Sequence, residues 1–310
     1  MALGLTAFRI SSGFRETMAL GVNLPSSGRM IGTAEGQFFL LEKGDQTHPM
    51  LLFAHGTAAW SGLWEPTLTV MGNNGFQAVG FDMPPFGFSE HAADKNYDRP
   101  RQAQRIIALL EALDAHPIII AHSVGAGPVA EAVMQRPDLV SGMIIVDGAI
   151  ALDGHADPKP VPYFLHSATF RDAITSSTVT NPLLTKQLLR QFMYIKDAVT
   201  PEIVQVLQQP QNRKGYTTAV SQWIPQLFVP PANARSTRRP YWQSLQVPTA
   251  FIWGNKDDIT PIDQAQELHN LVNGSKLFIL SNVGHIPQIE DAAQFWEILL
   301  KATTAISNEQ

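Results

Sequence analysis

Short runs of apolar residues recur along the chain, and segments with a helical repeat separate them. Runs such as 50–54 and 118–121 contain no polar residue, which is typical of strands buried on both faces. The segments between them, of which 100–113 is the clearest, place apolar residues at intervals of three and four, and this spacing predicts amphipathic helices. Because strands alternate with helices, we expect an α/β fold with a mostly parallel central sheet flanked by helices.

The alternation stops after Asp147 and resumes near residue 249. The expected strands lie at 30–31, 37–41, 50–54, 76–81, 118–121, 143–146, 249–253 and 276–280. The expected helices lie at 62–72, 100–113, 124–135, 183–194, 201–207, 263–272 and 292–302. The interval 153–241 contains prolines and helix-like stretches but no buried-strand pattern. We therefore expect a core formed by 30–152 and 242–310, with 153–241 inserted as a helical lid over the active site.

Residues 1–29 precede this core as an N-terminal extension. Phe8, Phe14 and Met18 can line one face of a short helix, and we expect that helix to pack on the body of the protein. Charged residues within the same run argue against a signal-peptide core. A membrane-proximal remnant of a longer precursor is the alternative. No window approaches 18 uncharged apolar residues, so we expect no membrane span.

The charge balance and the absence of cysteine exclude several classes of function. The 310 residues carry a formal net charge of −5 at pH 7, so no basic field is available to attract nucleic acid. The chain has no cysteine, which excludes disulfides, thiolate metal sites and cysteine nucleophiles. We expect a soluble protein that binds a small molecule, with the cytoplasm slightly favoured as its compartment. The sequence indicates no oligomeric state.

Three residues of catalytic type follow three of the expected strands. Ser123 lies on a strand-to-helix turn between Ala121 and Gly125, whose small size lets such a turn close tightly. His285 follows the last strand, and Asp257 follows the strand before it. Because ligands collect at the carboxyl ends of parallel strands, we expect these side chains to meet there. We predict a catalytic triad in which Ser123 is the nucleophile, His285 the base and Asp257 the acid that orients the base.

Each of these residues alone has a more ordinary explanation. A serine before a helix is usually an N-cap, and a histidine or an aspartate in a loop is usually structural or solvated. The chain order Ser, Asp, His at three strand ends is what favours catalysis. Asp258 and Asp147 are rivals for the acid, because Asp258 is adjacent to Asp257 and Asp147 ends another strand. His55 and His122 are expected to have structural roles.

Taken together, these motifs resemble those of α/β-hydrolases of the esterase, haloperoxidase and C–C hydrolase branch, from about residue 36 to residue 300. The resemblance rests on His55-Gly56-Thr57-Ala58, on 82–89, on the turn at Ser123, on 254–261 and on 284–290. It implies the α/β-hydrolase fold and an oxyanion hole formed by the backbone N–H groups of Thr57 and Val124. It also implies hydrolysis without a cofactor or a metal. Relatives that act as dehalogenases or epoxide hydrolases carry Asp at the nucleophile position, so Ser123 argues against those activities.

The predicted reaction is that of a carboxylesterase, which cleaves esters of small to medium apolar acyl groups through an acyl-enzyme. The candidate residues of the substrate pocket are the aromatic side chains of Trp60, Phe86, Phe164 and Trp223. One alternative is C–C bond hydrolysis of a ring-cleavage diketone, which uses the same triad, although relatives of that kind usually carry Trp where Ile286 stands here. The others are haloperoxidase-like chemistry and a non-catalytic ligand receptor on the same fold.

Overall fold

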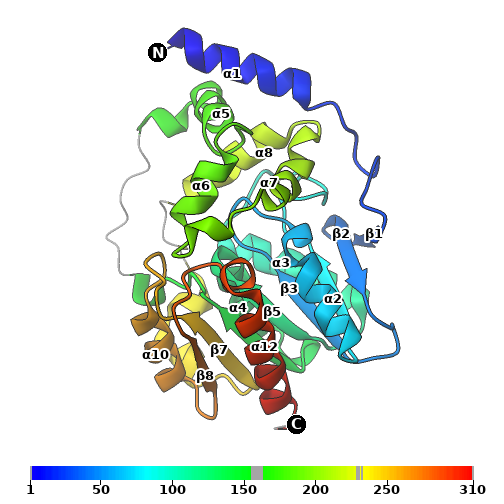
Figure 1. Ribbon diagram of the computed structural model, residues 1–310, viewed down its shortest axis with the longest axis vertical. Helices are drawn as coiled ribbons and strands as arrows, with labels where there is room; N and C mark the ends of the chain where they lie inside the picture. Colours follow the sequence, from blue (N-terminus) through cyan, green and yellow to red (C-terminus); the bar gives the residue numbers. More distant parts are fainter. Residues whose placement is uncertain (1, 155–162, 228–230, 232, 309–310) are drawn as a thin grey trace.

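The computed structural model describes residues 2–154, 163–227, 231 and 233–308. Its central sheet contains eight strands in the order β1-β2-β4-β3-β5-β6-β7-β8 (Figure 1). The strands are β1 (Gly28–Thr33), β2 (Gly36–Lys43), β3 (Met50–Ala54), β4 (Gln77–Phe81), β5 (Ile118–His122), β6 (Gly142–Val146), β7 (Thr249–Gly254) and β8 (Lys276–Leu280). The pairings of β1 with β2 and of β2 with β4 are antiparallel, and the others are parallel. The predicted mostly parallel sheet is confirmed.

Helices cover both faces of this sheet (Figure 1). The helices on one face are α3 (Arg99–Leu113), α4 (Ala126–Gln135) and α10 (Ile262–Leu271), and those on the other are α2 (Glu65–Asn73) and α12 (Ala292–Ser307). Successive residues of a strand point to opposite faces, so in β3 Leu52 belongs to the same core cluster as Ile106 of α3, whereas Phe53 belongs to that of Phe295 of α12. This burial on both faces is the reason for the uninterrupted apolar runs.

Between β6 and β7 the described residues form helices and no strand. The longer helices are α5 (Ala168–Ser177), α6 (Thr185–Gln191), α7 (Pro201–Gln208), α8 (Tyr216–Trp223) and α9 (Arg239–Gln243). We call the described residues of the interval 153–241 the helical insertion. Figure 1 shows α5 to α8 stacked over one end of the sheet. The helices α6 and α7 lie where the apolar pattern predicts them, whereas α5 and α8 have no clear pattern in the sequence.

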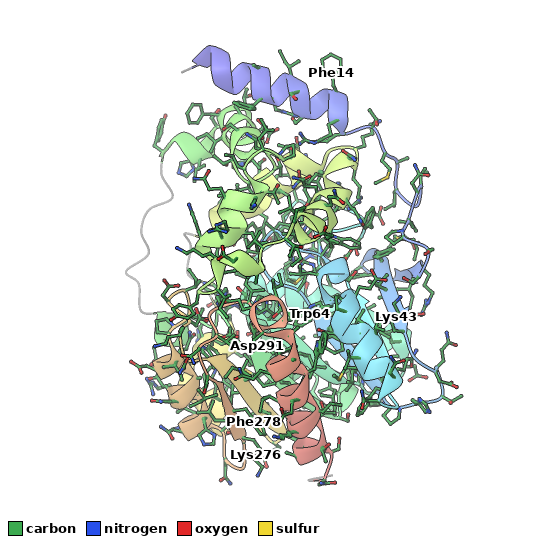
Figure 2. The ribbon with its side chains drawn as sticks, in the orientation of Figure 1. Phe14, Lys43, Trp64, Lys276, Phe278 and Asp291 are labelled. Carbon is green, nitrogen blue, oxygen red and sulfur yellow. The ribbon has the colours of Figure 1, made fainter. Side chains whose placement is uncertain are left out.

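The N-terminal helix α1 (Ala2–Arg15) lies across the far side of the helical insertion, against α5 (Figure 1). Its described contacts are largely polar: Arg9 Nη2 lies 3.1 Å from Thr218 Oγ1, and Arg15 Nη2 donates to the Thr180 carbonyl at 2.9 Å. The helix thus packs on the body of the protein as expected, but Phe14 takes no part in that packing, because it is 81% exposed and points away from the protein (Figure 2). None of the helices among the described residues is long and apolar enough to cross a membrane.

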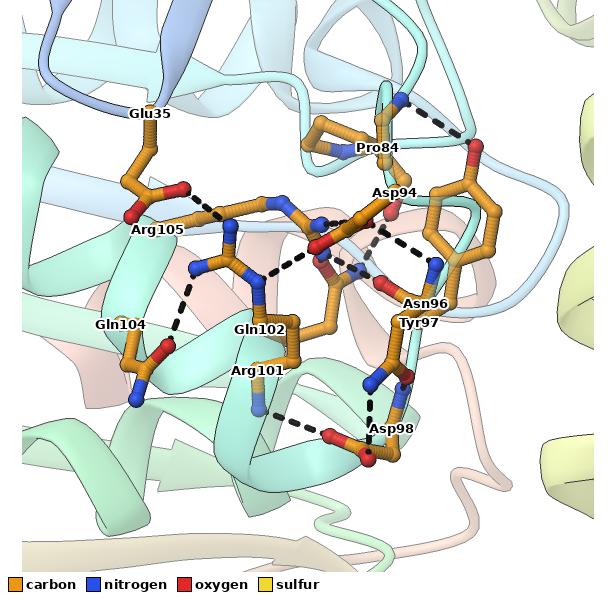
Figure 3. A network of polar contacts seen from close by, with 11 residues as sticks. Glu35, Pro84, Asp94, Asn96, Tyr97, Asp98, Arg101, Gln102, Gln104 and Arg105 are labelled. Atoms are coloured by element: carbon orange, nitrogen blue, oxygen red, sulfur yellow. Dashed lines mark hydrogen bonds and ion pairs between the residues drawn. The ribbon is translucent and has the colours of Figure 1, made fainter.

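A polar network fixes the loop between β4 and α3 (Figure 3). Arg105 is buried, donates to the Asn96 carbonyl at 2.7 Å and lies 2.7 Å from the Asp94 carboxylate. Gln102, one turn away on α3, donates to the Pro84 carbonyl. Because these partners lie along the whole loop, the network holds the loop at the carboxyl edge of the sheet, where the candidate site lies.

Candidate active site

Ser123 begins the turn that leads from β5 into α4. Its φ of 53° lies in the left-handed region, which residues other than glycine rarely adopt. The turn is closely packed, because a Cβ atom on Gly125 would lie 2.5 Å from the carbonyl oxygen of His55. Glycine is therefore required two residues after Ser123. The strained backbone points the Ser123 hydroxyl toward His285.

His285 contacts both other residues of the predicted triad. Its Nε2 lies 2.8 Å from Ser123 Oγ, and its Nδ1 lies 2.8 Å from Asp257 Oδ2. When the Nδ1 proton is donated to the carboxylate, Nε2 is free to accept the proton of the Ser123 hydroxyl. The structure thus brings the three residues together in an arrangement that can activate a serine nucleophile.

Hydrogen bonds hold the Asp257 carboxylate in place. Oδ1 accepts from the N–H groups of Ile259 at 2.8 Å and Thr260 at 3.0 Å, and Oδ2 accepts from the Thr260 hydroxyl at 2.6 Å. Burial works to raise the pKa of Asp257, but the hydrogen bonds from His285 and Thr260 hold that pKa below its usual value. Asp257 is therefore ionised at neutral pH and can stabilise a protonated imidazole.

The contacts of the two rival acids differ from those of Asp257. Asp258 is exposed. Asp147 is fully buried, and its Oδ1 accepts from the N–H of Gly254 at 2.9 Å. Among the described side chains, Asp257 is the carboxylate that contacts the His285 ring. The geometry therefore favours Asp257 as the orienting acid.

The loop after β3 lies directly against the Ser123 turn. A Cβ atom on Gly56 would lie 2.8 Å from His122 Nδ1 and 3.0 Å from Ser123 Cβ. Thr57 follows Gly56, and Val124 follows Ser123, so the two backbone N–H groups predicted for the oxyanion hole belong to adjoining segments. This packing is compatible with the predicted oxyanion hole, whose role in catalysis stays a prediction.

Two buried histidines support these loops. His55 Nε2 accepts from the N–H of Met83 at 2.9 Å, and its Nδ1 donates to the Gly56 carbonyl, with the two atoms 2.8 Å apart. His122 Nε2 lies 2.7 Å from the carbonyl oxygen of His285. Burial lowers the pKa of His55 to about 4 and that of His122 to about 3, so both rings are neutral at pH 7. These contacts agree with the structural roles expected for both residues.

Sequence reasoning missed Glu290 as a support of the candidate base. Its carboxylate accepts from the N–H groups of Gly284 and Ile286 at 3.1 Å each, on both sides of His285. It also accepts from the N–H of Ile195, in the helical insertion, at 2.7 Å. Glu290 therefore joins the His285 loop to the helical insertion. Its place five residues after the candidate base was the only signal in the sequence.

Two of the candidate pocket residues lie together next to the Ser123 turn. The rings of Phe86 and Trp223 are 4.9 Å apart in an edge-to-face contact. Both belong to an apolar cluster against which Ala58 and Val124 pack, and Val124 is the residue after Ser123. This cluster joins the helical insertion, which carries Trp223, to the loop that carries Phe86.

The other two candidate pocket residues are placed differently. Trp60 packs against Phe39 and Phe88, and its Nε1 donates to the Val206 carbonyl at 2.6 Å. These contacts place Trp60 in the core rather than beside Phe86. The side chain of Phe164 lies outside the described residues. Phe192, which is in the helical insertion, has its ring 6.3 Å from that of His285.

The side chains at the site are those of a nucleophile, a base and an acid. Within the described parts of the chain, no group of three or more His, Asp or Glu side chains could hold a metal ion. The hydroxyl, imidazole and carboxylate form one continuous hydrogen-bonded line, an arrangement of the kind that serine nucleophiles use in covalent catalysis.

Residues 49–292 match a protein family described as the alpha/beta hydrolase fold. The chain belongs to the α/β-hydrolase family. Among its relatives, 2-hydroxymuconate semialdehyde hydrolase of Pseudomonas sp. (strain CF600) is 22% identical over 278 residues, which cover 88% of this chain and 92% of the relative.

Solved structures of α/β-hydrolases have the same fold. A putative lipase from Acinetobacter baumannii AYE superimposes with a TM-score of 0.72 at 20% identity, covering 100% of this chain and 97% of the lipase. The meta-cleavage product hydrolase from Pseudomonas fluorescens IP01 gives a TM-score of 0.70 at 19% identity, covering 89% of this chain and 97% of that hydrolase. The predicted α/β-hydrolase fold is thus confirmed. The family indicates an enzyme of the hydrolase class.

Proposed function

We propose that this α/β-hydrolase is a serine hydrolase that cleaves carboxylic esters of small to medium apolar acids. The observation that carries the proposal is the line from Ser123 through His285 to Asp257, with 2.8 Å at each contact. His285 takes the proton of Ser123 as the hydroxyl attacks the carbonyl carbon, and Asp257 holds the imidazole tautomer. His285 then protonates the leaving alcohol, and water releases the acyl group.

In this proposal the backbone N–H groups of Thr57 and Val124 stabilise the oxyanion that forms in each step. Their segments adjoin, as the packing of Gly56 against Ser123 requires. Donors of this kind, fixed before the reaction, typically contribute about 3 kcal/mol each to transition-state stabilisation. The helical insertion acts in this proposal as a lid, because it supplies Trp223 to the cluster beside Val124.

The apolar side chains beside Ser123 support a neutral, apolar substrate. A charged acid requires a fixed cation to offset its desolvation. Two arginines of the helical insertion are engaged elsewhere: Arg171 Nη1 donates to the Leu165 carbonyl at 2.8 Å, and Arg190 Nη1 donates to the Lys196 carbonyl at 2.8 Å. Apolar acyl groups gain instead about 0.8 kcal/mol for each methylene that is buried.

The second candidate is C–C hydrolysis of a ring-cleavage diketone, and the names of the relatives favour it over ester cleavage. Both the 2-hydroxymuconate semialdehyde hydrolase and a relative named 2-hydroxy-6-oxo-6-(2'-aminophenyl)hexa-2,4-dienoic acid hydrolase, from Metapseudomonas resinovorans, match over more than four-fifths of this chain. The same Ser123 and His285 can serve this reaction, with a carbon rather than an oxygen as the leaving atom.

A substrate panel separates the two candidates. Purified protein is assayed with p-nitrophenyl esters of graded acyl length and with one vinylogous diketone. The ester proposal predicts that kcat/KM rises from acetate to butyrate or hexanoate and exceeds the value for the diketone. A profile that is flat over acyl length, together with rapid cleavage of the diketone, would establish the second candidate instead.

A further inference from the structure

Asp147 lies at the end of β6, between the strands that precede Ser123 and Asp257. It is fully buried, and its φ of 43° lies in the left-handed region. Its N–H donates to the Ile252 carbonyl of β7 at 3.1 Å, and its Oδ1 accepts from the N–H of Gly254 at 2.9 Å. Since Gly254 begins the turn that ends at Asp257, one carboxyl oxygen of Asp147 fixes the start of the acid loop.

The same segment also contacts the nucleophile turn. The N–H of Ala149 donates to the Ser123 carbonyl at 2.9 Å. The Thr260 hydroxyl lies 3.1 Å from the Asp147 carbonyl and 2.6 Å from Asp257 Oδ2. Residues 147–149 therefore join the turn that carries the nucleophile to the loop that carries the acid.

The second carboxyl oxygen of Asp147, Oδ2, is buried, and within the described chain no N–H or O–H group donates to it. The Asp257 loop is held against the same residue, because the N–H of Gly254 donates to Asp147 Oδ1 and the Thr260 hydroxyl lies close to both the Asp147 carbonyl and Asp257 Oδ2. The charge of Asp257 therefore acts directly on the Asp147 carboxyl group. Two ionised carboxylates so close together in a buried site repel each other and lack solvent, whereas one proton shared by the two groups removes both penalties.

The surroundings decide which carboxyl group holds that proton. Burial, and then the charge of Asp257, raise the pKa of Asp147 well above its usual value, and the charge of Glu290 acts in the same direction. The hydrogen bonds from His285 and Thr260 stabilise the ionised form of Asp257. The two environments therefore assign the proton to Asp147 and the charge to Asp257.

We propose that Asp147 is a positioning residue that works as a neutral carboxylic acid, donating its O–H to the Asp257 carboxylate while its other oxygen accepts from the N–H of Gly254. The inference rests on the proposed roles of Asp257 and His285. The neutral acid orients Asp257 toward His285 and takes up part of its charge, without adding a second negative charge beside the imidazole.

Two variants of Asp147 test this role. Asp147→Asn keeps both a donor and an acceptor, whereas Asp147→Leu has a similar volume and neither group. Asp258→Asn, which alters the exposed neighbour of Asp257, is the matched control. The readout is the rate at which a fluorophosphonate labels Ser123 as a function of pH, with thermal unfolding of each variant measured in parallel. Infrared spectroscopy detects the C=O stretch of a protonated carboxylic acid. The wild type should show this band for Asp147, and Asp147→Asn should lack it.

The expected result is that Asp147→Asn labels at close to the wild-type rate with the same pH profile. Asp147→Leu should label roughly 10- to 100-fold more slowly, as for loss of a hydrogen bond to a charged group. Its acid limb should also move to higher pH, because Asp257 then bears its full charge and favours protonated His285. A protein in which Asp147 is merely structural would lose thermal stability without moving that limb.

The opposite results are equally definite. If Asp147→Asn is as slow as Asp147→Leu, or if Asp147→Leu labels like the wild type, the inference is overturned. If Asp147→Leu fails to fold, the rate of Asp147→Asn and the infrared band decide. A wild type that labels at Ser123 but lacks the acid band refutes this inference alone. A wild type that shows the band but does not label refutes the proposed function, and the positioning role with it.

Discussion

The ring of His122 holds the main chain of His285, with Nε2 of one residue 2.7 Å from the carbonyl oxygen of the other. His122 directly precedes Ser123, so the strand that ends at the candidate nucleophile also fixes the backbone of the candidate base. A neutral imidazole can donate this hydrogen bond without placing a charge in the core. Protonation of the ring would place an unpaired charge in a buried site.

This burial predicts that stability depends on pH. The pKa of His122 is about 3 in the folded protein and 6.5 for an ordinary histidine. The stability that the neutral, buried ring provides is therefore fully present above about pH 6.5 and is lost as the pH falls toward 3. At about pH 5 the loss should be roughly 2 kcal/mol in the free energy of unfolding. Urea unfolding at about pH 7.5 and pH 5 measures it. His122→Gln should reduce the pH dependence, whereas His48→Gln, at an exposed site, should not. Equal pH dependence in all three proteins would contradict this account.

Asp257→Asn should lower turnover by up to about 10⁴-fold, because the amide can hold His285 in the wrong tautomer. Steady-state kinetics of the purified variant measure the effect. Asp258→Asn is the control, since it changes an exposed carboxylate one residue away. A larger loss from Asp147→Asn than from Asp257→Asn would assign the acid to β6 instead.

Much of the core could be predicted from the sequence, because burial on both faces of a sheet requires uninterrupted apolar strands such as β3 and β5. The meeting of Ser123, Asp257 and His285 also followed from their chain order and from their places after three strands, since parallel strands bring their carboxyl ends to one edge. The helical insertion was less predictable. Its helices α5 and α8 bury Thr175, Ser176, Thr217 and Ser221, polar residues that weaken the apolar repeat.

Contacts between distant segments could not be predicted from local pattern. Trp60 and Phe86 both lie in loops after strands and have similar chemistry, but Trp60 packs into the core and Phe86 packs against Trp223. One of the three N–H groups that donate to Glu290 belongs to Ile195, which is far from Glu290 in the sequence. No periodicity within one element indicates such pairings.

Glu290→Gln should destabilise the His285 loop. The glutamine side chain has one acceptor oxygen, and its NH₂ group would face backbone N–H donors that now reach the carboxylate. The expected loss is about 1–3 kcal/mol in the free energy of unfolding, as for buried donors left without a partner. Denaturant unfolding and kcat measure the two consequences. Glu297→Gln, on the exposed side of α12, is the control. Unchanged stability and unchanged kcat in Glu290→Gln would show that the three contacts contribute nothing.

Trp223→Ala should move the optimum acyl length to longer esters, because removal of the indole enlarges the apolar space beside Phe86. The same ester panel measures the shift in kcat/KM. Trp60→Phe supplies the control, since the Trp60 ring packs against Phe88 and not against Phe86. If Trp60→Phe moves the optimum and Trp223→Ala does not, the pocket lies on the other side of the Ser123 turn.

The most direct test of the proposed chemistry is covalent labelling of the nucleophile. The wild type and Ser123→Ala are treated with a fluorophosphonate, and the modified peptide is located by mass spectrometry. The account predicts one adduct on Ser123 in the wild type, none in Ser123→Ala, and a loss of hydrolysis of at least about 10³-fold in a variant that unfolds at the wild-type temperature. An adduct on another residue, or labelling that persists in Ser123→Ala, would contradict it.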